Sequence, residues 1–257
     1  MARATAGLAV AVLLVGAFAA SAGDVAATIA AGDAALQRLD LEAGIAAYRG
    51  ALEAAPDSYE ALWKLARALT DKATLSKQPA EQKGLCVEAE KLARRAGSVR
   101  PSDSKGHAYL AVAVGKLALF EGGKRKVELS KEVKAEAEKA LELDPNEDVA
   151  LHVLAIWNRE MVELGWLLRS FAQLLYGKFS PASLEAALAD LRRASELKPD
   201  VIPHHVELGI TLASAKRWAE AKTELEKGLA LPTAWVTDDH YRALARSSLP
   251  RVQDHLK

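Results

Sequence analysis

Five prolines recur along the chain, each where an apolar, helix-like stretch ends. They are Pro56, Pro101, Pro145, Pro199 and Pro232, and they are separated by 45, 44, 54 and 33 residues. Proline ends a helix because it has no backbone N–H and its ring clashes with the preceding turn. The shortest separation is close to the roughly 34 residues of a helix-turn-helix repeat, and the longer ones fit the same unit with insertions. The spacing therefore predicts a stack of repeated helical hairpins.

The first repeat has the residue types that two closely packed helices need. Gly32 lies in its first helix, Gly44, Tyr48 and Ala51 lie along its second, and Pro56 follows. Small residues are required where two helices nearly touch, because a larger side chain would push them apart. This order fits the tetratricopeptide consensus without a gap. We therefore predict an all-α fold, a tetratricopeptide-like α-solenoid of about five helix-turn-helix repeats with insertions and a C-terminal capping helix.

The three middle repeats are longer than the consensus. Repeat two contains a polar stretch with a proline at 70–84, and repeat three contains a glycine-rich, charged stretch at 121–126. Both stretches predict inserted loops. In repeat four, apolar residues between 166 and 175 recur at helical spacing and predict an additional helix. A last helix at about 238–249 is expected to cover the open end of the stack.

Residues 1–22 have the parts of a cleavable secretory signal. Arg3 supplies a positive charge, an apolar run extends from Gly7 to Ala19, and the small residues Ala20-Ser21-Ala22 follow. The apolar run is about 13 residues long, whereas a membrane-spanning helix needs about 20. We therefore predict cleavage after Ala22, a mature tetratricopeptide-repeat domain at 23–257, and export to the periplasm or secretion.

Composition excludes several classes of protein and site. The chain has 34 basic and 34 acidic residues, and loss of residues 1–22 would remove only one of these charges, Arg3. This balance argues against a nucleic-acid-binding protein, which would be basic. The single cysteine, Cys86, excludes an intramolecular disulfide and a multi-cysteine zinc site. The chain is 50% hydrophobic but only 5% aromatic, which suits helices packed through Ala and Leu.

Three segments from residue 106 onward resemble the regulator of microtubule dynamics family. They are Gly115–Lys131, Ala150–Glu160 and Pro203–Gly209. The resemblance implies a non-enzymatic helical repeat domain, and it implies a link to microtubules and organelle membranes, as in animal members. An export signal would place this chain where no microtubule is available. We therefore carry over the fold and the lack of catalysis, but not the microtubule partner.

Positions five and nine of each first helix usually face the concave groove of such a solenoid. In the last three repeats these positions are almost all apolar, whereas a groove for acidic peptide tails would present Lys, Arg and Asn. We therefore predict a groove for an apolar or amphipathic ligand, either a helix or a lipid chain. We call this row of apolar positions the apolar lane. The alternative is that the segment 166–176 folds back and fills the apolar lane. The candidate groove residues are Trp63, Ala108, Val112, His152, Ile156, Val206 and Ile210.

Three consecutive basic residues, Lys124, Arg125 and Lys126, follow two glycines. As a flexible turn they could meet phosphate headgroups or an acidic protein. Glu121 and Glu128 flank them, so a solvated surface loop is the alternative.

No arrangement of residues indicates catalysis, a metal or a cofactor. His204 and His205 are adjacent on a predicted helix and point about 100° apart, so they cannot easily share one ion. We expect one of them to pack against the neighbouring repeat and the other to meet solvent. Neither a Walker phosphate loop nor a Gly-x-Ser-x-Gly elbow is present.

Two functions from different classes remain, and neither is an enzyme. The first is a scaffold or adaptor that binds a protein segment in its groove, which is the usual work of this fold. The second is a carrier or tether for lipid or another apolar ligand, which the apolar lane would favour.

Overall fold

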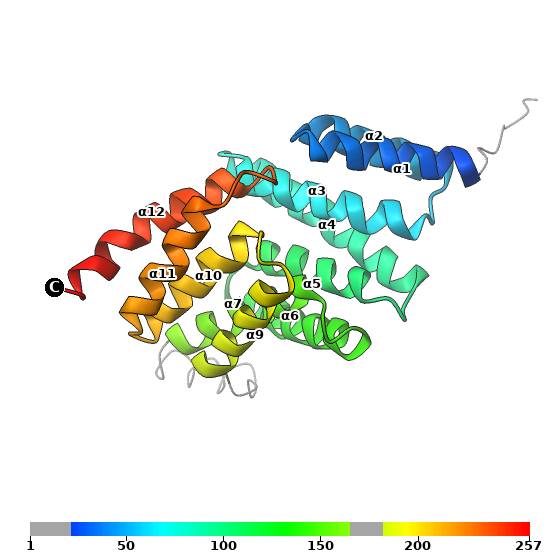
Figure 1. Ribbon diagram of the computed structural model, residues 1–257. Helices are drawn as coiled ribbons and strands as arrows, with labels where there is room; N and C mark the ends of the chain where they lie inside the picture. Colours follow the sequence, from blue (N-terminus) through cyan, green and yellow to red (C-terminus); the bar gives the residue numbers. More distant parts are fainter. Residues whose placement is uncertain (1–21, 165–181) are drawn as a thin grey trace, which may run out of the picture.

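The computed structural model describes residues 22–164 and 182–257, and within these ranges the chain is helical and contains no strand (Figure 1). The predicted all-α class is therefore confirmed. The described helices are α1 (Ala22–Gln37), α2 (Leu41–Ala54), α3 (Tyr59–Leu75), α4 (Pro79–Val99), α5 (Ser104–Ala118), α6 (Gly123–Leu143), α7 (Asp148–Glu163), α9 (Leu184–Leu197), α10 (Ile202–Ser214), α11 (Trp218–Ala230) and α12 (Asp238–Asp254).

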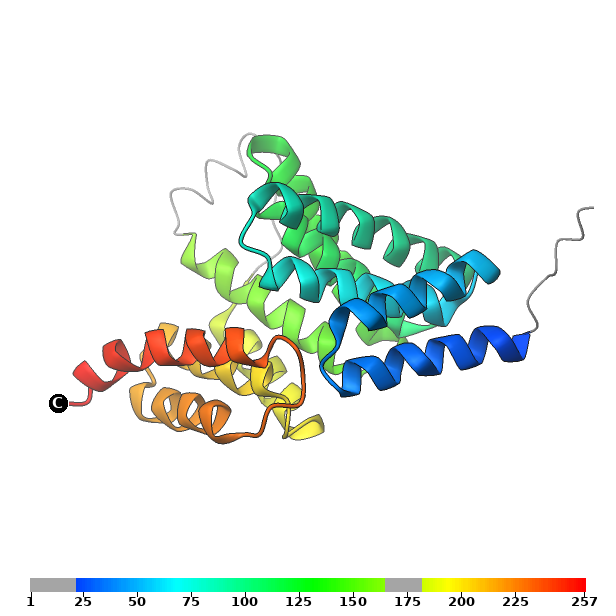
Figure 2. The ribbon, with the colours of Figure 1, turned by 90° about the horizontal axis from the view of Figure 1, so that it is seen from above.

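The helices form five successive hairpins, α1/α2, α3/α4, α5/α6, α7/α9 and α10/α11. The hairpins follow one another along a curve, with α1/α2 at one end and α11 and α12 at the other (Figures 1 and 2). The first helices of neighbouring repeats contact one another, α3 with α5, α5 with α7 and α7 with α10. We call these helices and α1 the inner layer, and the side that they line the concave face. The result is the predicted α-solenoid.

Glycines allow the two helices of a hairpin to approach closely. A Cβ atom on Gly32 would lie 2.6 Å from the Tyr48 ring, and one on Gly44 would lie 2.9 Å from Leu36. Gly209 of α10 meets α11 in the same way, 2.7 Å from Leu225. These distances are too short for carbon atoms in contact. The small-residue pattern of the first repeat is therefore confirmed as a packing pattern.

The predicted loops in repeats two and three are wrong, because most of these residues are helical. Helix α3 continues to Leu75 and α4 begins at Pro79, so the stretch 70–84 lengthens two helices. In α4 the buried residues are Cys86, Ala89, Ala93 and Ala96, at helical spacing, and the polar residues between them face outward. The polarity of the stretch therefore belongs to the exposed side of a helix.

Buried apolar side chains form two main clusters. The first joins repeats one to three and includes Leu65, Leu69, Val114, Leu129 and Cys86. The second joins repeats four and five to α12 and includes Leu188, Leu191, Leu212, Leu225 and Val252. Helix α12 packs on α10 and α11, which confirms the capping helix. None of the helices that the structure describes is both long and apolar enough to cross a bilayer.

Candidate binding site on the concave face

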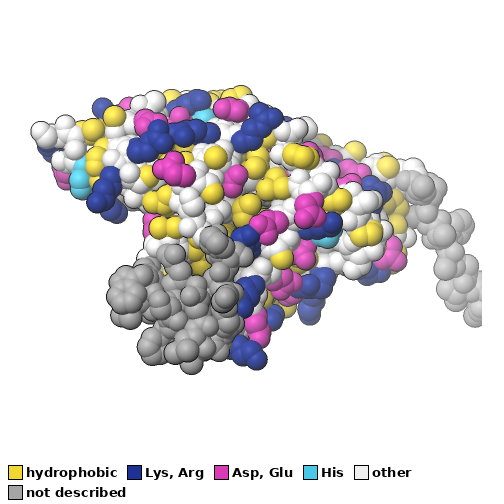
Figure 3. All heavy atoms as spheres, turned by 90° about the horizontal axis from the view of Figure 1, so that it is seen from below, with side chains coloured by type: hydrophobic (Ala, Val, Ile, Leu, Met, Phe, Trp, Pro, Cys, Tyr) yellow, Lys and Arg dark blue, Asp and Glu magenta, His cyan; other side chains and the backbone are white. Residues whose placement is uncertain are grey.

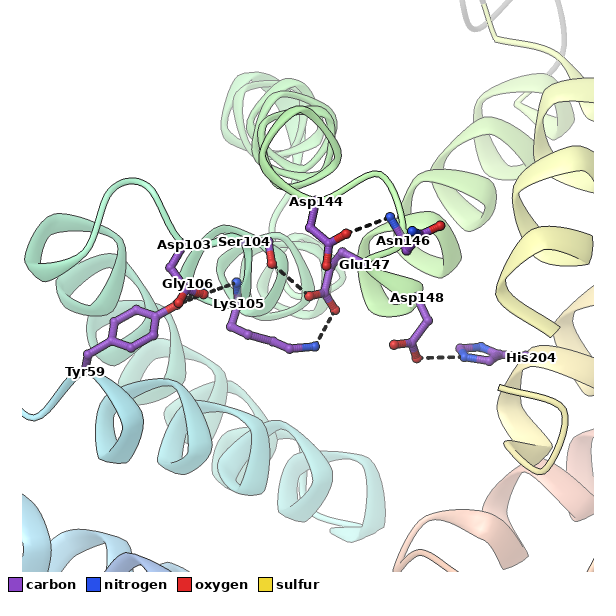
Figure 4. A network of polar contacts seen from close by, with 10 residues as sticks. All are labelled: Tyr59, Asp103, Ser104, Lys105, Gly106, Asp144, Asn146, Glu147, Asp148 and His204. Carbon is purple, nitrogen blue, oxygen red and sulfur yellow. Dashed lines mark hydrogen bonds and ion pairs between the residues drawn. The ribbon is translucent and has the colours of Figure 1, made fainter. Parts of the chain in front are cut away.

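Polar contacts connect the N-terminal ends of successive inner-layer helices (Figure 4). The Tyr59 hydroxyl of α3 donates a hydrogen bond to Asp103 Oδ1 at 2.5 Å and accepts one from the Gly106 amide at 3.1 Å. Asp103 is also the N-cap of α5, and its carboxylate accepts from the Lys105 amide. The start of α5 is therefore held both by its own cap and by the preceding repeat.

The next contact joins α5 to α7 through a buried carboxylate. Glu147, only 1% exposed, precedes α7 and accepts a hydrogen bond from the Ser104 hydroxyl at 3.0 Å. It also forms an ion pair with Lys105 at 2.7 Å. Burial would lower the pKa of Lys105, but the hydrogen bond and the charge of Glu147 raise it, so the amine stays protonated. A carboxylate at this position also interacts favourably with the positive, N-terminal end of the α7 helix dipole.

A chain of one carboxylate and two imidazoles joins α7 to α10. Asp148 Oδ2 lies 3.0 Å from His204 Nε2 (Figure 4). His204 Nδ1 lies 3.0 Å from His152 Nδ1. Burial, together with the charges of His204 and Arg159, lowers the pKa of His152 well below its usual value. His152 is therefore a neutral imidazole, held in place by its hydrogen-bonded neighbour.

A buried ion pair follows further along the same two helices. Arg159 of α7 lies 2.6 Å from Glu207 of α10 and donates to the Thr211 hydroxyl at 3.2 Å. Both charged side chains are less than 10% exposed. Their charges therefore compensate each other between the two helices.

The segment between α11 and α12, residues 231–237, reaches back to the second repeat. The indole Nε1 of Trp235 donates to Asp71 Oδ2 of α3 at 2.8 Å, across 164 positions of sequence. The Arg67 guanidinium of α3 lies 3.7 Å from the centroid of the Trp235 ring. Asp238 accepts from the Ala234 and Trp235 amides and so shapes the segment. The C-terminal end of the solenoid therefore contacts its N-terminal half at the concave face.

Aromatic and basic groups of α3 and α5 surround this contact. The rings of Trp63 and Tyr109 are stacked at 5.3 Å between centroids, and the Arg67 guanidinium is 6.0 Å from the Tyr109 ring. Lys116 of α5 donates to the Thr74 hydroxyl at 2.7 Å. Burial raises the pKa of Asp71 and lowers that of Lys116, and in each case nearby opposite charge limits the shift. The centre of the concave face therefore carries charged and aromatic groups.

The comparison with protein families identifies this architecture. The model of the family of regulator of microtubule dynamics proteins 1–3 matches residues 28–253. The chain belongs to this family. Regulator of microtubule dynamics protein 1 from Mus musculus is 34% identical over 142 residues, which are 55% of this chain and 47% of the mouse protein. Protein 3 from Xenopus laevis is 30% identical over 143 residues, 56% of this chain and 31% of the frog protein. The chain thus spans less than half of these relatives.

Two solved structures share the fold of this family member. A thermophilic repeat protein from Thermus thermophilus superposes with a TM-score of 0.63 at 18% identity, covering 88% of this chain and 99% of that protein. PilW, described as a type IV pilus biogenesis factor, gives a TM-score of 0.52 at 16% identity, covering 90% of each chain. At these identities the likeness concerns the fold alone.

Two of the predicted groove residues are not on the concave surface. Ala108 and Val206 are both 0% exposed, so their assignment to the groove was wrong. Ala108 packs with Ala140 of α6, and Val206 lies where a Cβ on Gly228 of α11 would touch it at 2.8 Å. Both side chains face the second helix of a hairpin, because close helix packing at these positions takes the side chain into the core.

The other five candidates are partly exposed, but polar groups interrupt the predicted apolar lane. Trp63 stacks on Tyr109, and His152 is hydrogen-bonded to His204. Val112 and Ile210 pack against the edges of the two core clusters, and Ile156 is partly exposed on α7. The alternative, in which segment 166–176 fills the lane, lies outside the described residues.

The basic residues predicted to form a loop belong to a helix instead. Lys124, Arg125 and Lys126 are exposed on the first turn of α6, which begins at Gly123. Lys124 and Arg125 each lie 3.7 Å from Glu128. The expectation for the two adjacent histidines was also wrong in part, since His204 and His205 are 4% and 1% exposed. His205 is held by Glu224 and by the Pro199 carbonyl, so neither ring meets solvent.

Sequence reasoning assigned no role to Asp71, Lys116 or Trp235. The first two lie inside helices and resemble ordinary surface charges. Trp235 offered one signal, since a tryptophan in the short non-helical segment after Pro232 has no helix face to explain it. Its partner could not be found without the curvature of the whole stack.

Proposed function

We propose that this protein is a non-enzymatic scaffold that binds a segment of a partner protein on its concave face. The observation that carries the proposal is the group of partly exposed polar and aromatic side chains there. Arg67, Lys116, His152 and Trp235 come from three repeats and from the segment 231–237. Groups from several rigid elements, directed at one surface, suit the recognition of an extended chain or helix.

The described residues give little support to catalysis. They contain no group of three or more His, Cys, Asp or Glu side chains able to hold a metal ion. Cys86 is buried, and burial raises the pKa of its thiol, so it is a poor nucleophile. The histidines of α7 and α10 are engaged in hydrogen bonds between helices. A binding role therefore fits these groups better than a chemical one.

Surface charge also fits a protein partner. On the face shown in Figure 3, Lys and Arg side chains alternate with Asp and Glu over the described surface. A nucleic-acid partner would favour a continuous basic area. An apolar lipid ligand would favour an unbroken apolar lane, and Ala108 and Val206 do not contribute to one.

We also propose export, with cleavage after Ala22 and the domain 23–257 in the periplasm or outside the cell. N-terminal sequencing of protein isolated from the producing cells is expected to begin at Gly23. A chain beginning at Met1 in the cytoplasm would contradict export and would restore microtubules as a candidate partner.

Photo-crosslinking tests the scaffold function in the cells that produce the protein. A benzophenone amino acid replaces Ile156, which shares a face of α7 with His152, and in a control it replaces Ala135, exposed on α6. We expect protein adducts from position 156 but not from position 135. Lipid adducts alone would favour a carrier. Equal adducts at both positions, or none, would contradict the concave face as the binding surface.

A further inference from the structure

The geometry points to an anion-binding site on the concave face, centred on Arg67, that takes a carboxylate of an acidic segment of the partner. This inference rests on the scaffold function proposed above and specifies the chemistry of its ligand. It arises from hydrogen-bond donors that the protein itself leaves without acceptors.

Three donor side chains of α3 and α5 lie around this site. The Arg67 guanidinium is 6.0 Å from the Tyr109 ring, and the charges of Arg67 and Lys116 both act on Asp71. The Arg67 guanidinium makes no hydrogen bond and no ion pair with any described residue, and its recorded contacts are the rings of Tyr109 and Trp235. Lys116 uses one of its three N–H groups, on Thr74. The Tyr109 hydroxyl has no recorded partner in the described part of the chain. Oγ of Ser195 is the one fully buried side-chain polar atom there without a partner, so the unpartnered donors of Arg67 and Tyr109 are in reach of solvent, and Lys116 is partly exposed.

Aromatic contacts hold the guanidinium in place without using its donors. Cζ of Arg67 lies over the Trp235 ring, 3.7 Å from its centroid. A guanidinium held over an aromatic ring by this contact keeps its N–H groups available for other partners. Trp235 is in turn fixed by its hydrogen bond to Asp71, and Tyr109 is fixed by its stack on Trp63. Asp71 is therefore a positioning residue. A donor set held rigid before binding loses little entropy when an anion arrives.

The local charge selects a singly charged ligand. Arg67 and Lys116 supply two positive charges, and Asp71 and Asp238 supply two acids close to them. Glu207 and Glu147 already have basic partners, Arg159 and Lys105. No excess of positive charge remains for a phosphate dianion, whereas one guanidinium matches one carboxylate. Arginine also binds a carboxylate with two parallel N–H bonds.

Fluorescence anisotropy with labelled peptides tests the site on the purified protein. The probes are acetyl-(Ala-Glu)₃ with an amidated end, acetyl-(Ala-Gln)₃ with a free carboxylate, and acetyl-(Ala-Gln)₃ with an amidated end. We expect one or both carboxylate peptides to bind at least about tenfold more tightly than the neutral peptide, because hydrogen bonds to charged groups are strong. The first two probes distinguish side-chain from C-terminal carboxylates. Binding should weaken as salt rises.

Two substitutions locate the site. Arg67→Gln should weaken binding of the carboxylate peptide about tenfold or more, and Arg67→Lys should weaken it less because the charge remains. Arg246→Gln, at an exposed position of α12, is the control and should change nothing. Thermal unfolding of each variant checks the fold. If Arg67→Gln unfolds the protein, NMR spectroscopy of the wild-type protein is used in place of the variant. The Nε–Hε signal of Arg67 should then shift on addition of the carboxylate peptide.

Several results would overturn the inference. They are equal binding of charged and neutral peptides, unchanged binding by folded Arg67→Gln, and an unshifted Arg67 signal. Tighter binding of inorganic phosphate at Arg67, or binding of anionic phosphatidylglycerol vesicles without binding of peptide, would assign the site to phosphate chemistry instead. Protein adducts at position 156 that persist in Arg67→Gln would leave the scaffold function standing while the carboxylate site fell.

Discussion

At the scale of single residues, burial decides which charged groups are matched and which are not. Glu147 and Glu207 are almost fully buried, and each has a basic partner within 2.7 Å. Asp190 of α9 differs, since it has no recorded partner in the described part of the chain. Burial raises the pKa of Asp190 to about 6. When the carboxylate in this position ionises, it destabilises the folded state relative to the unfolded chain.

Replacement of Asp190 by Asn should therefore stabilise the protein in a pH-dependent way. Below the ordinary pKa of 3.8, Asp190 is protonated in both states and contributes nothing. As the pH rises from 3.8 to about 6, the unfolded chain ionises while the folded state keeps the proton, so stability is lost across this range, and the loss is complete above about 6. At pH 8 we expect Asp190→Asn to raise the unfolding free energy by about 1–2 kcal/mol, less than the full shift because solvent screens a partly buried group. At pH 4 the gain should be small.

Urea unfolding at the two pH values measures this difference. Asp200→Asn, at an exposed position in the turn after α9, is the control. It should change the unfolding free energy by the same small amount at pH 4 and at pH 8. A gain from Asp190→Asn that is equal at pH 4 and pH 8 would show that the carboxylate charge is not its cause.

At the scale of helices, the distance between the two members of a hairpin depends on where side chains are missing. Gly209 lies against Leu225, and Gly84 of α4 has nothing within 4 Å of its missing Cβ. Both glycines are inside helices, so helix propensity treats them alike. The two glycines differ in their packing instead, because only Gly209 has a neighbour against its Cα.

We expect Gly209→Ala and Gly84→Ala to change stability in opposite directions. The new methyl group at 209 forces α10 and α11 apart and should cost about 1–3 kcal/mol. At 84 it only reduces the freedom of the unfolded chain and should gain about 0.5–1 kcal/mol. Denaturant unfolding of both variants measures the two values. If Gly209→Ala were neutral, the hairpin would tolerate a wider spacing than its contacts indicate.

At the scale of the whole molecule, the segment 231–237 links the last repeat to the second. The link has two parts, the Trp235 hydrogen bond to Asp71 and the Arg67 contact with the indole face. Arg242 supports the segment by donating to the Leu231 carbonyl and the Thr233 hydroxyl. A solenoid whose repeats contact only their neighbours would bend more freely. We infer that this link limits the opening of the curve.

Trp235→Ala should therefore expand the molecule as well as destabilise it. We expect a loss of about 2–4 kcal/mol, since Trp235 is only partly buried, and a larger radius of gyration in small-angle X-ray scattering. Trp235→Phe keeps the ring but loses the N–H donor, so its effect should be smaller. Trp218→Ala removes a comparable ring that stacks on His255 at the far end of the chain. It is the control, and expansion by Trp218→Ala alone would refute the link.

The fold was predictable from sequence because its signals act over short distances. Gly32, Gly44 and Tyr48 lie within one hairpin, and each hairpin repeats the same local contacts. The loops of repeats two and three were misassigned because a polar stretch is common to loops and to the exposed side of a long helix. The core positions of Ala108 and Val206 were misassigned because the consensus register does not fix how closely two helices pack.

The helical repeat, its approximate number of units, its capping helix and the family of the chain are thus predictable from the order of residue types. These properties follow from periodic residue types whose partners lie within one or two turns of helix or in the adjacent helix. The chemistry of the concave face, in contrast, depends on how the hairpins are arranged in space. Arg67, Asp71 and Trp235 meet there because the hairpins curve, and the sum of their packing angles brings together residues 164 positions apart.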